Sequence, residues 1–154
     1  MGGSGSITVN GVTAASSGGI SGVVTLKAVK DEGTVTFTSA GSTFMALAAQ
    51  ADAGVAIAAN VVSTSGFITL DGDMDQGFDS AANNVNFADG NTLKSATIMT
   101  LKSVTDGIVA SGRLTLSAKE GVYIASSMAG AASTKALVIN ADSDSSGNSG
   151  TLTV

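Results

Sequence analysis

The 154-residue sequence contains no cysteine and no histidine. Without these side chains the chain cannot form disulfides, and it cannot bind zinc or iron–sulfur clusters through thiolate or imidazole ligands. Thiol chemistry and every histidine-based catalytic system are excluded for the same reason. The absence of cysteine does not fix the cellular compartment, because a disulfide-free protein can occur anywhere.

Aromatic and charged side chains are scarce as well. Aromatics make up 4% of the residues with no tryptophan, and charged residues make up 12%, about half the usual share of a soluble domain. The apolar fraction is nevertheless 44%, so the core has to be built mainly from Val, Ile, Leu and Ala. Small and β-branched side chains favour thin, evenly layered β-structure. A surface of Ser, Thr, Asn and Gly is common on extracellular and fibrous β-proteins.

Neither a concentration of basic residues nor a long apolar run is present. The formal net charge is −5, and the seven basic residues do not cluster, which argues against nucleic acid as a partner. No run of 18 apolar residues exists, so we expect no membrane insertion through a transmembrane helix. We interpret residues 1–6, which are rich in Gly and Ser, as an expression linker and set them aside.

The dominant positive feature is a short run of alternating apolar residues, usually entered through Gly, that recurs along the chain. Thr separates the apolar residues in most of these runs, so it points outward where its neighbours point inward. The predicted strands are residues 7–9, 23–26, 34–38, 55–57, 67–70, 85–87, 97–101, 114–116, 122–124, 137–139 and 151–154.

Two alanine-rich segments are ambiguous. Residues 44–53 contain good helix formers and predict either a short helix or a strand of small residues. Residues 128–132 include a glycine and are interpreted as a loop.

Three matches in the same order along the chain suggest an internal duplication. Residues 25–31 match 100–106, residues 33–37 match 112–116, and residues 70–75 match 139–144. We therefore predict two units of roughly 75 residues, 7–79 and 80–154, within one continuous array. Chance similarity in a chain rich in Thr, Gly and Val is the alternative.

The strand pattern favours an all-β fold, a parallel β-helix or solenoid. A strand of three to five residues needs neighbours above and below it, and similar strands at similar spacing suit parallel stacking. An antiparallel β-sandwich is the alternative, because Asn10-Gly11, Asp71-Gly72, Asp89-Gly90 and Asp106-Gly107 could form hairpin turns.

Three glycine-led units carry a family resemblance, namely residues 33–38, 66–70 and 112–118. They resemble the Gly-x-apolar-Thr-apolar rungs of filamentous-haemagglutinin-type adhesins, and the chain is similar to the repeat regions of other giant, low-aromatic surface proteins. The resemblance implies a right-handed parallel β-helix that is secreted or attached to a cell surface and acts as stalk, adhesin or fibre. The acidic interruption from Asp71 to Asp89 departs from that pattern and predicts a disturbance of the coiling.

The acidic stretches predict a cation site. Asp71, Asp73, Asp75 and Asp79 alternate with other residues, so their carboxylates can converge on a hard cation such as Ca²⁺ when the chain curls. The helix-loop-helix calcium motif is not satisfied, because Gln76 stands where that motif needs glycine. The matching stretch supplies Asn140, Asp142 and Asp144. Solvated acidic turns are the alternative.

Catalysis is not expected. Asp73, Asp75 and Asp79 could in principle work as acid and base on a polysaccharide. However, Arg113 is the only arginine, Tyr123 is the only tyrosine, and sugar-stacking aromatics are nearly absent.

The sequence therefore predicts a non-enzymatic structural module of an extracellular or cell-surface repeat protein. Its terminal strands, Ile7–Val9 and Thr151 to Val154, could pair head-to-tail between copies and build a filament. Binding of Ca²⁺ or a glycan is the second hypothesis. The Thr-x-Thr elements at 34–38 and 151–153 add ice binding as a remote third.

Overall fold

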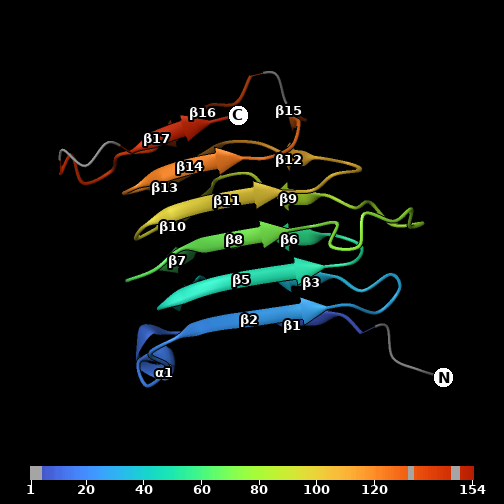
Figure 1. Cartoon of the computed structure of the whole chain (residues 1–154), viewed down its shortest axis with the longest axis horizontal. Helices are drawn as coiled ribbons and strands as arrows, with labels where there is room; N and C mark the ends of the chain where they lie inside the picture. The colour runs from blue at the N-terminus through green and yellow to red at the C-terminus, as the bar shows by residue number, and fades with distance from the viewer. Residues whose placement is uncertain (1–4, 132–133, 147–149) are drawn as a thin grey trace.

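The computed structural model describes residues 5–131, 134–146 and 150–154. The described chain is all-β and about 3% helical, and it winds as a parallel solenoid of about five turns (Figure 1). All strand pairs within the described ranges are parallel. The predicted β-solenoid is confirmed, and the antiparallel sandwich alternative is wrong.

Three parallel sheets form the walls of the solenoid, and we call them sheets A, B and C. Sheet A contains β1 (Ile7–Val9), β3 (Val35–Phe37), β6 (Val55–Ile57), β9 (Val85–Phe87), β12 (Ile108–Ala110) and β15 (Met128–Gly130). Sheet B contains β2 (Val23–Ala28), β5 (Ala46–Ala51), β8 (Ile68–Asp71), β11 (Ile98–Lys102), β14 (Gly121–Ile124) and β17 (Thr151–Thr153). Sheet C contains β4 (Ser42–Phe44), β7 (Val61–Ser63), β10 (Asn91–Ser95), β13 (Leu114–Ala118) and β16 (Leu137–Asn140).

Each turn visits sheet A, then sheet C, then sheet B. In the first turn the place of the sheet C strand is taken by the helix α1 (Ala14–Ser17), which packs against β4. The N-cap of the helix is Thr13, whose hydroxyl accepts a hydrogen bond from the Ser16 amide in a capping box. The Ser17 hydroxyl donates to the carbonyl of Thr43 and so ties the helix to the edge of sheet C.

Ladders of aliphatic side chains fill the interior. Val35, Val55 and Val85 lie directly over one another in sheet A and are buried. In the next inward ladder of sheet A, the large side chain of Phe87 lies between Ile57 and the small Ala110. This stacking of inward side chains, rather than aromatic clustering, holds the turns together.

Within residues 44–53, which allowed helix or strand, Phe44 ends β4 and residues 46–51 form β5. Burial in β5 alternates, with Leu47 and Ala49 buried and Ala48 and Gln50 half-exposed. Pairing with β2 and β8 on both sides outweighs the helix propensity of alanine. The loop interpretation of residues 128–132 is wrong for Met128–Gly130, which pairs with β12 as β15; Ala132 lies outside the described residues.

The acidic interruption does not disturb the coiling. Residues 72–84 leave the wall after β8 and return at β9, and the register continues on either side, with Val55 beside Val85 and Ile68 beside Met99. A long insertion is tolerated because it lies at a corner between sheets, where it interrupts no ladder.

Of the three sequence matches that suggested a duplication, one pairs residues at the same position of the same sheet. Thr25 and Thr100 share one ladder of sheet B, with Ala48 and Thr69 between them. In the other two matches the partners lie on different sheets, since Val35 is in sheet A and Leu114 in sheet C, and Leu70 is in sheet B and Ile139 in sheet C. The division into units 7–79 and 80–154 stays a prediction from the sequence.

Among the described residues, no helix has both the length and the apolar character needed to cross a bilayer.

Candidate functional site

The connections from sheet B to sheet A bring three carboxylates together. Asp31 follows β2, Asp52 follows β5 and Asp79 lies in the insertion after β8, so the three residues come from successive turns. One carboxylate oxygen from each lies within 4.8 Å of the others. We call this group the acidic corner. Of the predicted metal ligands it contains only Asp79; Asp31 and Asp52 were missed because solitary aspartates after separate strands carry no local motif.

Asp52 is the most enclosed member of the acidic corner, at 4% exposure. One of its oxygens accepts a hydrogen bond of 2.8 Å from the amide of Glu32 in the previous turn. Burial raises the pKa of Asp52, and the negative charge of Asp79 raises it further. The site is therefore one in which negative charge accumulates.

Glu32 fastens the insertion to the acidic corner. Its carboxylate accepts hydrogen bonds from the hydroxyl and amide of Ser80 and from the amide of Ala81. These bonds, led by the Ser80 hydroxyl, lower the pKa of Glu32. Glu32 itself has a φ of 62°, so a non-glycine residue is held in the left-handed region. The result is that Asp79, next to Ser80, is placed beside Asp52.

The other predicted ligands of the first stretch have separate partners. Asp71 forms an ion pair of 3.1 Å with Lys102 of the next turn. Asp73 accepts hydrogen bonds of 2.7 Å from both the amide and the hydroxyl of Thr105. Asp75 accepts a hydrogen bond from the amide of Gly77. Asp71 thus joins two neighbouring strands of sheet B, whereas Asp73 binds the insertion to the next turn and Asp75 binds it to itself.

Several buried oxygens of the insertion lack a hydrogen-bond partner among the described residues. They are Oδ1 of Asp73, Oδ2 of Asp79 and Oδ1 of Asn83. The residues Asp73 and Asn83 are 0% and 1% exposed. A buried acceptor without a donor is costly, and its presence calls for a missing partner.

The second predicted ligand stretch lies between β16 and β17, at a different corner. The side chain of Asn140 accepts a hydrogen bond from the amide of Asp142, and Asp144 accepts one from Ser146. Oδ1 of Asp142 is buried without a partner among the described residues. Among the described residues, Asp142 and Asp144 belong to no group of three acidic side chains that could hold a metal ion.

Polar side chains at the corners tie successive turns together. The Asp106 carboxylate accepts from the amide of Asn83, the Asn60 side chain accepts from Thr92, and the Ser63 hydroxyl accepts from Ala96. Each bond spans one turn, so the corners are hydrogen-bonded where the strand ladders stop. Asp106 was named in the sequence only as part of a possible hairpin turn, and Asn60 and Ser63 were not singled out, because single Ser and Asn residues in turns have no spacing signal.

The threonine elements do not form a continuous ladder. In sheet A the neighbours of Thr36 are Thr8 and Ala56. In sheet B the column containing Thr25, Thr69 and Thr100 is interrupted by Ala48 and Tyr123. The regular threonine lattice on which the ice-binding hypothesis relied is thus broken on both faces.

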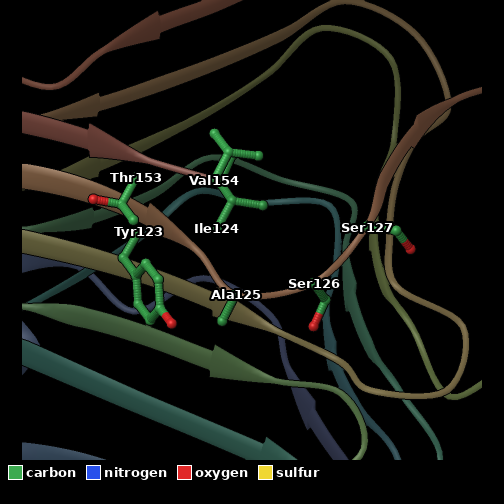
Figure 2. Close-up of a pocket in the computed structure, with 7 residues that line it drawn as sticks. All are labelled: Tyr123, Ile124, Ala125, Ser126, Ser127, Thr153 and Val154. Atoms are coloured by element: carbon green, nitrogen blue, oxygen red, sulfur yellow. The ribbon is translucent and has the colours of Figure 1, made fainter.

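The other candidate surface is the C-terminal end of the solenoid, where the inward ladders lie open. Leu152 lies over the buried Val122 but is itself 46% exposed, and Val154 is 83% exposed. A hollow of about 400 Å³ lies beside Val154, over the corner that leads from β14 to β15 (Figure 2). In the turns below, the corner of the next turn occupies the corresponding place.

The N-terminal end is covered only in part. Helix α1 lies over the edge of sheet C, while β1 and β2 are the edge strands of sheets A and B. The inward residues Ile7, Val9, Val24 and Leu26 are half-buried, in contrast to the fully buried ladders of the central turns. Among the described residues, two of the three sheets therefore present an unpaired edge strand at this end (Figure 1).

The fold places the chain in the class of parallel β-solenoids. Comparisons with protein families, with curated proteins and with solved structures found no match.

Proposed function

We propose that this chain is a structural module of an extracellular or cell-surface fibre, stalk or adhesin, and that copies of it stack end to end. The observation that carries the proposal is the uncovered apolar interior at the C-terminal end, where Leu137, Leu152 and Val154 are about half or more exposed. Open strand edges over exposed aliphatic side chains are templates for a further rung. The proposal assigns the chain no catalytic activity.

The sheet order determines which edges pair in such a stack. β1 belongs to sheet A and β17 to sheet B, so they are not opposite each other. A stack that continues the walls pairs β15 of one copy with β1 of the next, and β17 with β2. The paired strands run in the same direction because all strands of the solenoid are parallel. The terminal strands Ile7–Val9 and Thr151–Thr153 both take part, but with different partners.

Two features of the ends fit this arrangement. The hollow beside Val154 has the position of a sheet B to sheet A corner, and residues 5–6, which lead into β1, would enter it from the next copy. At sheet C the strand β16 would meet helix α1 rather than a strand. The contact joins two different surfaces, so it does not close on itself and produces a filament.

Leu137 and Val138 offer a matched pair of variants on one strand. Leu137 lies over the buried Leu114 and therefore faces inward, whereas Val138 lies over Thr115 on the outer face. Their exposures are 48% and 50%. A lysine at 137 would be buried by a docking copy, but a lysine at 138 would stay in solvent.

We expect Leu137→Lys to weaken self-association at least tenfold, since a buried leucine contributes about 1.5–3 kcal/mol and a buried charge costs more. Val138→Lys should leave association close to that of the unchanged chain. Sedimentation velocity across a concentration series measures both, and electron microscopy reports whether the assemblies are filaments. Leu152→Lys and Thr153→Lys repeat the comparison on β17, in case the first pair disturbs folding of the last turn.

Circular dichroism of each variant separates lost stacking from lost structure. The proposal fails if the unchanged chain stays monomeric up to millimolar concentration. It also fails if the inward and outward lysines weaken association equally while the variants keep their β-structure.

A further inference from the structure

We propose that the acidic corner is a Ca²⁺ site, with Asp31, Asp52 and Asp79 as its carboxylate ligands. The inference does not depend on end-to-end stacking, because the three carboxylates meet within one copy, although Asp31 follows the edge strand β2 of the first turn.

The distances match the coordination sphere of the ion. Ca²⁺ binds oxygen ligands at 2.3–2.6 Å, so two ligands of one ion lie at most about 5 Å apart. The three carboxylate oxygens of the acidic corner lie within 4.8 Å of one another. They come from three successive turns, and an ion between them would join those turns at a point where no strand ladder runs.

The acidic corner brings three carboxylates together, of which Asp52 is buried, Asp79 is half-buried and Asp31 is exposed. Asp52 is only 4% exposed, so its carboxylate has little access to solvent. The ion pairs found among the described residues involve Asp71 and Asp89 and none of the three ligands. Like charges held this close in a protein are stabilised by a cation or by protonation.

A second, independent observation concerns hydrogen bonding. Oδ2 of Asp79 is buried and has no donor among the described residues. Missing protein donors around enclosed oxygens indicate that the missing partner is positive, and a metal ion supplies that without a hydrogen.

The chemistry of the donors favours Ca²⁺ over Mg²⁺. All three ligands are carboxylates, and they come from separate corners, which gives an irregular arrangement. Ca²⁺ accepts six to eight oxygens in flexible geometry, whereas Mg²⁺ demands a near-ideal octahedron and keeps most of its waters.

Thermal unfolding of the chelator-treated chain with and without CaCl₂ tests the proposal. Binding to the native state alone should raise the melting temperature by about 5–10 °C when free Ca²⁺ exceeds the dissociation constant about 100-fold. Calorimetric titration should give one strong site per chain. Asp79→Asn should abolish the rise, because it removes one ligand charge while keeping the size of the side chain.

Asp52→Asn provides a second readout that distinguishes a ligand from an ordinary structural residue. Without Ca²⁺ this variant should melt above the unchanged chain, since it relieves repulsion and its amide oxygen can still accept from Glu32. With Ca²⁺ it should show no rise. Glu120→Gln is the control: it also removes one negative charge, but from another corner, and it should keep the full rise.

Three results would overturn the proposal. The first is no rise at 10 mM CaCl₂, a concentration about ten times the weakest dissociation constant of extracellular Ca²⁺ modules. The second is a rise of equal size in Asp79→Asn, Asp52→Asn and the unchanged chain, which would locate binding elsewhere. The third is an equal rise with Mg²⁺, which would contradict the assignment of the site to Ca²⁺.

Discussion

At the scale of single residues, Asp89 illustrates how a corner side chain joins turns. One of its oxygens accepts a 2.7 Å hydrogen bond from the Arg113 amide, and both oxygens lie 3.5 Å from a cation, Arg113 on one side and Lys135 on the other. Gly112 is required beside it, because a Cβ there would lie 2.4 Å from the Asp89 carboxylate. A single aspartate thereby connects three successive turns.

This arrangement predicts a specific dependence of stability on pH. The Arg113 amide, with Lys135 and Arg113, lowers the pKa of Asp89 below its ordinary value of 3.8. A carboxyl with a lowered native pKa contributes stability above the unfolded value and loses it as pH falls through the native value. Asp89→Asn should therefore melt at most about 3 °C lower at pH 7, and the difference should vanish well below pH 3.8.

Melting curves of both chains from pH 7 to pH 2 measure the effect. Asp144→Asn is a suitable control, since Asp144 is exposed and accepts a local hydrogen bond from Ser146. A difference between Asp89→Asn and the unchanged chain that grows on acidification would contradict the account.

At the scale of elements, α1 is the part of the first turn most dependent on its own local bonds. It has only four residues, so it relies on the Thr13 capping box and on Ser17, whose hydroxyl reaches Thr43. Thr13→Ala removes a cap that contributes about 1 kcal/mol. Because α1 lies at one end, the loss should appear as local opening.

Hydrogen exchange distinguishes local from global loss. In Thr13→Ala the amide of Thr43, which donates to the carbonyl of Val12, should exchange faster, while the amide of Leu101 in a central turn keeps its rate. Equal acceleration at both amides would mean that the helix stabilises the whole solenoid.

Some strands were predictable from the sequence and others were not. Strands with apolar inward positions, such as β6 and β9, were predicted with their observed bounds. The strands β4, β7 and β10 were missed because inward positions are polar: Ser42, Ser63, Asn91 and Ser95 are buried but hydrogen-bonded at corners. An alternating hydrophobicity pattern reveals buried apolar side chains. It does not reveal a buried hydroxyl that is hydrogen-bonded to the backbone.

The candidate site was predictable only in part for a related reason. Asp79 belongs to a dense acidic stretch and was noticed, whereas Asp31 and Asp52 approach it only because the turns place three corners side by side. Their separation in sequence varies with the insertion length, so no fixed spacing encodes the site. Knowledge of the register is needed before the cluster can be recognised.

At the scale of the whole molecule, each turn contacts only the turns above and below it, so stability is a sum of neighbouring interfaces. Central turns have two such interfaces, and each end has one. The exposures of Phe87 and Leu152 reflect this, at 0% and 46%. Opening should therefore begin at the C-terminal end, where β16 and β17 lie over the last buried ladder.

Two alanine variants test that gradient. Phe87→Ala leaves a cavity between Ile57 and Ala110 and should cost about 3–5 kcal/mol of unfolding free energy. Leu152→Ala should cost far less in the monomer, since its side chain is already half in solvent, and the loss should be confined to faster exchange in β17. Denaturant unfolding gives the free energies, and hydrogen exchange locates the opening.

Comparing Leu152→Ala in monomers and in filaments tests the stacking geometry. If copies stack through β17 and β2, the Leu152 side chain becomes buried, and Leu152→Ala should lower the stability of filaments by much more than that of monomers. Exchange of the β17 amides should slow on assembly, while those of the central strand β8 keep their rates. Equal costs of Leu152→Ala in the two states would show that β17 stays at a free end, and the stacking geometry would have to be abandoned.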